Sequence, residues 1–197
     1  IYDAQAIISA YRYLEELKAK NLMVQINSIG CRVCRPNYKK KLIEYYKKQD
    51  TCKECVGRLE KNPLRLLDCK NDACQLIKLG APSILDSLCA ACREHFKESL
   101  EYLDEVNIPY TLNPYLVRGL DYYNRTVFEI FREGSDLAIA SGGRYDYLSE
   151  MLGGRPTPAT GVAIGLERTV EMLRADSKDQ VNKVKSKVFL VHVGEVT

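Results

Sequence analysis

The stretch LVRGLDYYNRTVFEI, from Leu116 to Ile130, decides the fold that we expect for this sequence. Its apolar and aromatic residues are typical of strands, and Arg118 interrupts them with a charge. An unpaired charge inside a strand is unfavourable, so Arg118 should meet a carboxylate or an anionic ligand. On spacing alone, a structural ion pair with Asp121 or Glu129 is an equal alternative.

Further polar features in this half of the sequence indicate a pocket. Consecutive Tyr122 and Tyr123 would point to opposite faces of a strand, so at least one could line a pocket while the other fills the core. Gly142 and Gly143, in SGGRYD, would let the backbone approach a ligand closely, although a plain turn explains them equally well. Arg168 lies in the first turn of a predicted helix, where the helix dipole disfavours a cation unless an anion such as phosphate is near.

Around this stretch the sequence predicts an α+β fold, an antiparallel sheet flanked by helices. Strands are expected at 23–29 and in IPYTLNPYLVR, RTVFEIF, LAIAS and TGVAIG, with helices at the N-terminus, 145–152 and 166–173. Prolines and glycines divide the region between into helical pieces, which indicates an all-helical inserted domain. The predicted order is core, first part, 1–30; helical insertion 31–107; core, second part, 108–175; polar linker 176–186; and a further domain beginning at 187–197.

Composition excludes several classes of protein. The 197 residues are 46% hydrophobic and 28% charged, as in ordinary soluble globular proteins. No run of about 18 apolar residues could span a bilayer, and the N-terminus does not resemble a signal peptide, so we expect a cytoplasmic protein with no membrane partner. The net charge of +3 is too small to identify a nucleic-acid binder by itself.

Basic charge is concentrated at the start of the insertion. Between 32 and 48 there are seven lysines and arginines against one acid, with tyrosines interleaved. This pattern suits contact with a nucleic-acid backbone, although lysine-rich helices are more often simply solvated faces. The candidate contact residues are Arg32, Arg35, Lys39, Lys40 and Lys41.

All eight cysteines also lie in the insertion, which points to metal ligands or reduced thiols rather than disulfides. Two CxxC pairs, Cys31 with Cys34 and Cys52 with Cys55, have the spacing of a four-cysteine structural zinc site. The remaining cysteines, with His95 nearby, could form another; they are Cys69, Cys74, Cys89 and Cys92. A metal could stabilise a small module that has little core of its own.

Several of these segments, in this order, resemble landmarks of the histidyl-tRNA synthetases, a family of class II aminoacyl-tRNA synthetases. LVRGLDYYNRTVFE resembles the histidine-specific signature, SGGRYDYL the glycine-rich strand, and GVAIGLER the motif 3 strand and helix. INSIGC, NPLRLLDCK and APSILDSLC also resemble family segments. The cysteines are not part of the general family pattern, so zinc is no part of what the resemblance implies.

The resemblance implies a histidine–tRNA ligase, in which histidine reacts with ATP and magnesium to give histidyl-adenylate and is transferred to tRNA(His). It assigns Arg118 to catalysis, at the α-phosphate and the histidine carboxylate, and Arg168 to the γ-phosphate. Tyr122 and Tyr123 would shape the histidine pocket. Gly142, Gly143 and Arg144 would line the substrate pocket, with Gly142 and Gly143 at histidine and Arg144 on the ATP side.

The resemblance also bears on organisation. It implies a homodimer, an insertion that approaches the tRNA, and an anticodon-binding domain that begins at 187–197. Motif 1 and motif 2 should precede Ile1 and are not present, so we expect an internal fragment that does not aminoacylate tRNA alone.

Two other functions compete with this interpretation. The synthetase-like regulatory subunit of ATP phosphoribosyltransferase shares the core and binds histidine, but it typically lacks the helical insertion and the intact arginine signature. A stand-alone zinc-dependent RNA-binding module would account for the cysteines and lysines, but not for the second half of the chain.

Overall fold

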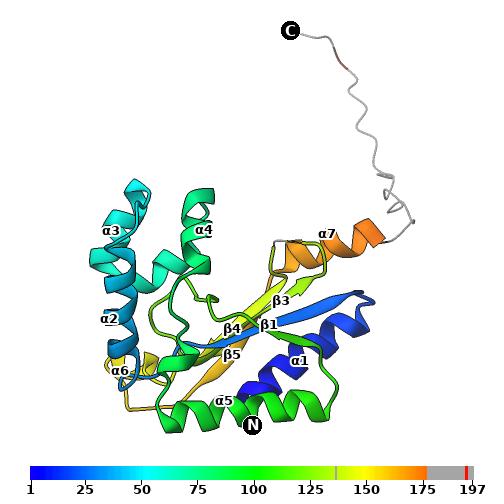
Figure 1. Ribbon diagram of the computed structural model, residues 1–197. Helices are drawn as coiled ribbons and strands as arrows, with labels where there is room; N and C mark the ends of the chain where they lie inside the picture. Colours follow the sequence, from blue (N-terminus) through cyan, green and yellow to red (C-terminus); the bar gives the residue numbers. More distant parts are fainter. Residues whose placement is uncertain (136, 177–193, 195–197) are drawn as a thin grey trace.

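A five-stranded sheet organises the computed structural model, which describes residues 1–135, 137–176 and 194 (Figure 1). The strand order is β2-β1-β3-β4-β5. The strands are β1 (Leu22–Ser28), β2 (Tyr110–Leu112), β3 (Asn124–Arg132), β4 (Ala140–Arg144) and β5 (Thr160–Ile164). The expected α+β class is confirmed. The sheet is mixed, because β2 runs parallel to β1 while the other neighbours are antiparallel.

One face of the sheet is apolar and covered by helices. Alternate side chains of the strands, such as Ile26, Phe128 and Ile130, are fully buried there. They form one core with helices α1 (Tyr2–Glu16) and α5 (Ala90–Glu105), which lie together below the sheet in Figure 1. Helix α7 (Leu166–Asp176) adds Met172 to the same core.

Short helices form a second packing group at one end of the sheet (Figure 1). They are α2 (Arg35–Tyr46), α3 (Lys53–Lys61), the 3₁₀ helix η1 (Pro63–Asp68), α4 (Asp72–Leu79) and the 3₁₀ turn η2 (Leu85–Ser87). Tyr38, Leu42, Tyr46 and Leu66 fill their shared core, together with buried cysteines. Helix α5 lies within the predicted insertion at 31–107 but packs with the sheet's core, so that region contains two packing groups.

The predicted strand over IPYTLNPYLVR is wrong beyond its first residues. Strand β2 ends at Leu112, and a turn follows in which the Leu116 N–H donates to the Asn113 carbonyl over 2.9 Å. Arg118 and the two tyrosines after it therefore lie in a loop before β3, not in a strand. Pro114 and Gly119 end the strand pattern, because neither supports a regular ladder.

The remaining predictions concern the helices, linker and further domain of the C-terminal part, and membrane spans. The short helix predicted near 145–152 is α6 (Leu148–Met151), and the next is α7. The predicted linker and the first strand of a further domain fall at 177–193 and 195–197, outside the described residues. Among the described helices, none has the length and apolar character needed to cross a membrane.

A buried ion-pair network fastens the start of α1 to the sheet. Both terminal nitrogens of Arg144 are engaged, Nη2 with Asp3 and Nη1 with Asp146, each over 2.8 Å. The Asp3 side chain is 1% exposed and also lies 3.3 Å from His95 Nε2. Burial alone would raise the pKa of Asp3, but hydrogen bonds from Arg144 and Thr126 outweigh it and hold that pKa below its usual 3.8.

Replacing Asp3→Asn is expected to destabilise the fold by about 3 to 5 kcal/mol, because it leaves a buried arginine with one carboxylate fewer. Urea unfolding at neutral pH measures the loss. A group whose folded pKa is depressed stabilises the fold above its unfolded pKa, and this contribution disappears as pH falls through the folded pKa. The difference between wild type and Asp3→Asn should therefore shrink below pH 3.8. The exposed Glu98→Gln is the control, expected within about 0.5 kcal/mol; equal loss in both variants would contradict the assignment.

Candidate functional site

The second face of the sheet is polar at its centre and borders a cavity. Gln25, Glu129 and Ser141 lie opposite one another on β1, β3 and β4, so their side chains emerge on the same face. A cavity of about 270 Å³ adjoins this row. Its polar lining includes Gln25, Asp68, Lys70, Lys78, Asn113, Tyr115, Glu129 and Arg168. Charged groups of both signs therefore surround a space large enough for a small molecule.

Arg118 reaches this row from the loop before β3. Its Nη1 forms an ion pair with Glu129, and its Nη2 donates to Ser141 Oγ over 2.9 Å. The expected ion pair with Glu129 is thus present, whereas Asp121 instead accepts from the Asn62 side chain. Arg118 Nε is buried and has no hydrogen-bond partner among the described residues. Each terminal nitrogen carries a second N–H besides the one directed at Glu129 or Ser141, and the side chain is 24% exposed, so an anion can still approach the guanidinium.

Three tyrosines form a cluster beside Arg118. The rings of Tyr122 and Tyr123 lie 4.5 Å apart, and each packs edge-on against Tyr145. The two consecutive tyrosines therefore lie together, and the expectation that they point to opposite faces of a strand is wrong, because they precede the strand. Burial and a hydrogen bond with Tyr122 raise the pKa of Tyr123 to about 12, although Arg118 opposes the shift. Tyr123 therefore keeps its proton at neutral pH.

The two glycines lie within β4 and not in a turn. A Cβ on Gly143 would lie 2.5 Å from the Thr126 carbonyl oxygen and 3.0 Å from the Tyr123 ring. A Cβ on Gly142 would lie 2.8 Å from the Phe128 ring. Because these glycines have no Cβ, β4 can pack closely between its neighbouring strands. The tyrosine cluster can also pack directly against β4.

The other two candidate arginines lie on different sides of the sheet. Arg168, in the first turn of α7, lines the cavity with Glu129 and donates from Nη1 to the Ala138 carbonyl over 2.7 Å. Arg144 points instead toward α1, in the buried network with Asp3 and Asp146. Arg168 therefore lines the cavity, Arg118 is held beside it by its ion pair with the lining residue Glu129, and Arg144 does not reach it.

The basic residues at the start of the insertion have three different environments. Arg35 is largely buried and donates to the carbonyls of Ile29, Gly30 and Tyr123 over 2.7 to 3.0 Å. Arg35 thus fixes the fold, and its contact with nucleic acid stays a prediction.

Arg32 is exposed, pairs with Glu150 over 2.8 Å and lies over the Tyr147 ring. Lys39 is half-buried; burial, and then nearby Arg35, lower its pKa. Lys40 and Lys41 are exposed on α2, although Lys41 also reaches Ser87 over 3.2 Å. Lys40 and Lys41, which are exposed on α2, are therefore accessible to a partner.

The cysteines divide into two groups of four, and the predicted grouping of Cys31 and Cys34 with Cys52 and Cys55 is wrong. The first group is Cys31, Cys34, Cys89 and Cys92, and the second is Cys52, Cys55, Cys69 and Cys74. The twelve residues of α2 separate the two predicted pairs, and a helix of that length extends about 18 Å. Each pair therefore finds partners that follow later in the chain. His95 joins neither group, because it lies beside Asp3.

The cysteine groups each contain one thiol that ionises readily. Burial would raise the pKa of Cys31, but backbone N–H groups of Cys34 and Val33 donate to it and lower its pKa to about 6. Hydrogen bonding from the backbone of Cys55 lowers the pKa of Cys52 to about 7.

Several polar residues of the cavity were not expected from the sequence as site residues. Gln25, Asn113 and Glu129 line it from three separate segments, and Ser141 lies beside Glu129 on β4. A usable signal was present in β1 and β3, where Gln25 lies between Val24 and Ile26 and Glu129 between Phe128 and Ile130. Asn113 and Ser141 carried no such signal.

Comparison with known proteins identifies the family. The model of the family "Histidyl-tRNA synthetase" matches residues 45–169. A histidine–tRNA ligase of Desulfitobacterium hafniense is 46% identical over 98% of this chain and 46% of its own length. One from Aquifex aeolicus is 43% identical over 98% of this chain and 47% of its own.

Solved structures agree with the sequence comparison. Apo S. aureus histidyl-tRNA synthetase superimposes with a TM-score of 0.69 at 31% identity, over 89% of this chain and 44% of that one. An ATP phosphoribosyltransferase regulatory subunit/histidyl-tRNA synthetase from Bacillus halodurans C shares the fold at 19% identity, with a TM-score of 0.57 and 87% of this chain covered. The chain spans less than half the length of the curated relatives that it matches. From its matched signature, its sheet and its relatives, we conclude that this chain belongs to the histidyl-tRNA synthetase family.

Proposed function

We propose that this chain supplies half of the active site of a histidine–tRNA ligase, which joins histidine to ATP as histidyl-adenylate and then to tRNA(His). The observation that carries the proposal is a polar cavity lined by Arg168 and Glu129, with Arg118 held beside it by its ion pair with Glu129. ATP enters as its magnesium complex, and the carboxylate of histidine attacks the α-phosphate. Negative charge accumulates on phosphate during this step, so fixed cations beside it are the main catalytic requirement.

Each cation has a separate task in this proposal. Arg118 binds the α-phosphate and the histidine carboxylate while Glu129 and Ser141 keep its plane in place. Arg168 binds the γ-phosphate after leaving the Ala138 carbonyl. We leave Arg144 out of the ATP site, because two carboxylates already surround its guanidinium on the other face of the sheet.

The tyrosine cluster is the proposed pocket for the histidine side chain. Tyr122 and Tyr123 stand beside Arg118, and Gly143 leaves room for the Tyr123 ring. A hydroxyl that stays protonated can both donate and accept, which suits an imidazole ring. Gly142 and Gly143 contribute by letting β4 lie close against this cluster.

A regulatory subunit that binds histidine without activating it is the alternative. The Bacillus halodurans protein whose name includes such a subunit is 19% identical, which speaks for the fold alone. Arg118 and the helical insertion favour the ligase, because the regulatory subunit typically lacks the insertion and the intact arginine signature. Histidine binding without adenylate formation would support the alternative.

The remaining parts of the proposal concern partners and location. We propose that the ligase acts in the cytoplasm as a homodimer and that the exposed lysines of α2 approach the phosphates of tRNA(His). Lys40 and Lys41 carry this role, with Arg32 and Lys39 at its margin.

Arg118→Ala, made in a full-length protein that contains this segment, is expected to slow histidine-dependent exchange of pyrophosphate into ATP by about 100- to 1000-fold. The loss reflects a charge that acts on the reacting phosphate. Arg12→Ala, at an exposed position on α1, is the control and should keep normal exchange.

A double variant separates catalysis from structure at this position. If Arg118 serves only to neutralise Glu129, then Glu129→Gln should restore exchange to Arg118→Ala. We expect stability to recover and exchange to stay low; recovery of exchange would contradict the catalytic assignment.

Lys40→Ala with Lys41→Ala should weaken tRNA(His) binding, because the two ammonium groups no longer neutralise phosphates. The slope of log affinity against log salt should fall by about one for each phosphate that a replaced lysine had neutralised. Filter binding of the full-length protein across a salt series measures both. Lys97→Ala, at an exposed lysine on α5, is the matched control. An unchanged affinity and slope in the double variant would assign the α2 lysines to a solvated face.

A further inference from the structure

The two cysteine groups have the dimensions of tetrahedral metal centres. In each group all four sulfur atoms lie within 4.8 Å of one another. Sulfur pairs Cys31–Cys34, Cys31–Cys89 and Cys52–Cys69 are each separated by 3.8 Å. Four sulfurs about 2.3 Å from one zinc ion, at the corners of a tetrahedron, are about 3.8 Å apart. We propose that each group binds one structural Zn²⁺ through four thiolates.

The first site joins the helical insertion to the sheet. Cys31 and Cys34 follow β1 directly and precede α2, while Cys89 and Cys92 lie at the start of α5. Two backbone groups point at the sulfurs, Cys31 N–H to Cys34 Sγ over 3.3 Å and Val33 N–H to Cys31 Sγ over 3.4 Å. Such N–H donors stabilise the thiolate form that a metal requires. A metal here would fix the two points at which the chain enters and leaves the group of short helices from α2 to η2.

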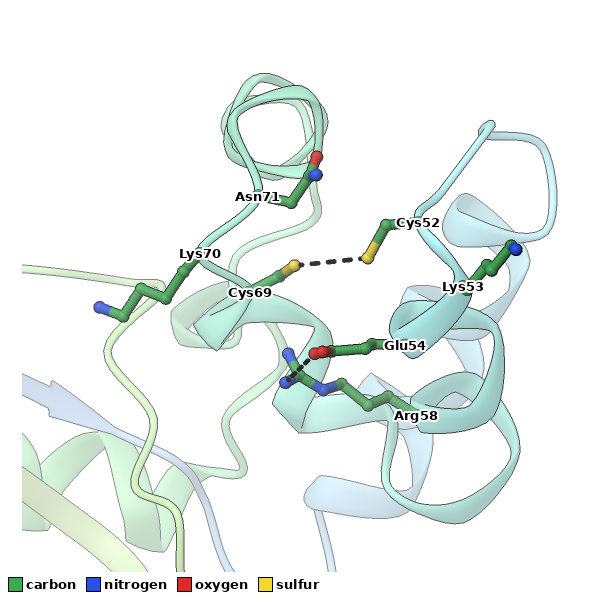
Figure 2. Close-up of a pocket in the computed structure, with 7 residues that line it drawn as sticks. All are labelled: Cys52, Lys53, Glu54, Arg58, Cys69, Lys70 and Asn71. Atoms are coloured by element: carbon green, nitrogen blue, oxygen red, sulfur yellow. Dashed lines mark hydrogen bonds and ion pairs between the residues drawn. The ribbon is translucent and has the colours of Figure 1, made fainter.

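The second site joins the short helices at the far end of the insertion. Cys52 caps α3 and Cys55 lies in its first turn, while Cys69 follows η1 and Cys74 lies in α4. Figure 2 shows Cys52 and Cys69 facing each other across a hollow of about 360 Å³ that is also lined by Lys53, Lys70 and Arg58. Glu54 also lines the hollow and pairs with Arg58 over 3.0 Å. A zinc ion with four thiolates carries a double negative charge, and the two lysines offset it.

Zinc suits these groups better than the other occupants of four-cysteine sites. None of the eight sulfurs is bonded to another. Each cysteine has three cysteine neighbours in its group, whereas a disulfide needs only one. The spacing of the sulfurs fits a single ion and leaves no room among them for a cluster of several irons. Between a single zinc and a single iron, zinc is the usual ion of structural four-cysteine sites. Six of the eight cysteines are buried in the core of the short helices, so a metal bound to them would contribute directly to the folding of these helices.

Elemental analysis of the 197-residue protein, purified under reducing conditions without metal-affinity resin, tests the proposal. We expect two zinc ions per chain, and one in each of Cys92→Ser and Cys74→Ser. Each single variant serves as the control for the other site. One zinc or none in the wild type would overturn the pair of sites, as would iron in their place or disulfides between the cysteines.

Cobalt replacement keeps the test decisive if a serine variant fails to fold. Co²⁺ added to the reduced, metal-free protein should give the visible bands and the near-ultraviolet sulfur-to-metal band of tetrahedral cobalt–thiolate centres, saturating at two equivalents. Zinc should displace these bands and protect all eight thiols from alkylation. Saturation at one equivalent, or thiols that alkylate freely with zinc present, would contradict the proposal.

Discussion

The candidate site depends on a loop that lies outside the hydrogen-bonded strands of the sheet. Residues 113–123 run from the end of β2 to the start of β3 and place Arg118 above the sheet. From below, the fully buried Asn27 donates to the carbonyls of Pro114 and Leu116 over 3.2 and 2.9 Å. Because buried backbone carbonyls need partners, one asparagine side chain fixes the path of the whole loop. The position of the proposed catalytic cation therefore rests on a residue of β1.

The helical insertion holds the same loop from above. Arg35 donates to the Tyr123 carbonyl over 2.7 Å, and the Tyr115 hydroxyl donates to the Leu79 carbonyl over 3.0 Å. The helices that provide these contacts are short; α2 has twelve residues and α4 has eight, too few to be stable alone. Whatever orders these helices also orders the loop, which couples the insertion to the polar cavity.

Much of the fold could be predicted from the local pattern of apolar residues in the sequence. The wrongly predicted strand has a physical cause. Helix α1 and strands β3 and β5 have periodic apolar residues that meet a partner directly, so the sequence predicts them. The loop at 113–123 contains the same apolar and aromatic residues as a strand, since its side chains are also buried. A buried loop and a buried strand have the same local composition. Here the tertiary hydrogen bonds of Asn27 hold the segment as a loop.

In the candidate site, too, some residues could be predicted from their neighbours in sequence, while others depend on contacts with residues far along the chain. Arg118 and Arg168 could be found because a cation at each position conflicts with its local surroundings. Arg35 shows no such conflict, and its structural role depends on three carbonyls, of which that of Tyr123 is distant in sequence. The cysteine groups were mispaired for a related reason: the nearest CxxC pair along the chain lies at the other end of α2, while the true partners follow much later.

The ion pair between Arg118 and Glu129 raises the question of how a cation already bound to a carboxylate can serve a phosphate. A lysine would present one compact charge, and a carboxylate in contact would compete directly with the incoming anion. Arginine presents five donors in a planar fork, and here Glu129 and Ser141 each contact one of the two terminal nitrogens. Each of these nitrogens carries a second N–H, and the side chain is 24% exposed, so a second anion can bind beside Glu129. Glu129 then acts as an anchor that orients the guanidinium before the substrate arrives, and preorganised cations stabilise developing charge best when they need not move.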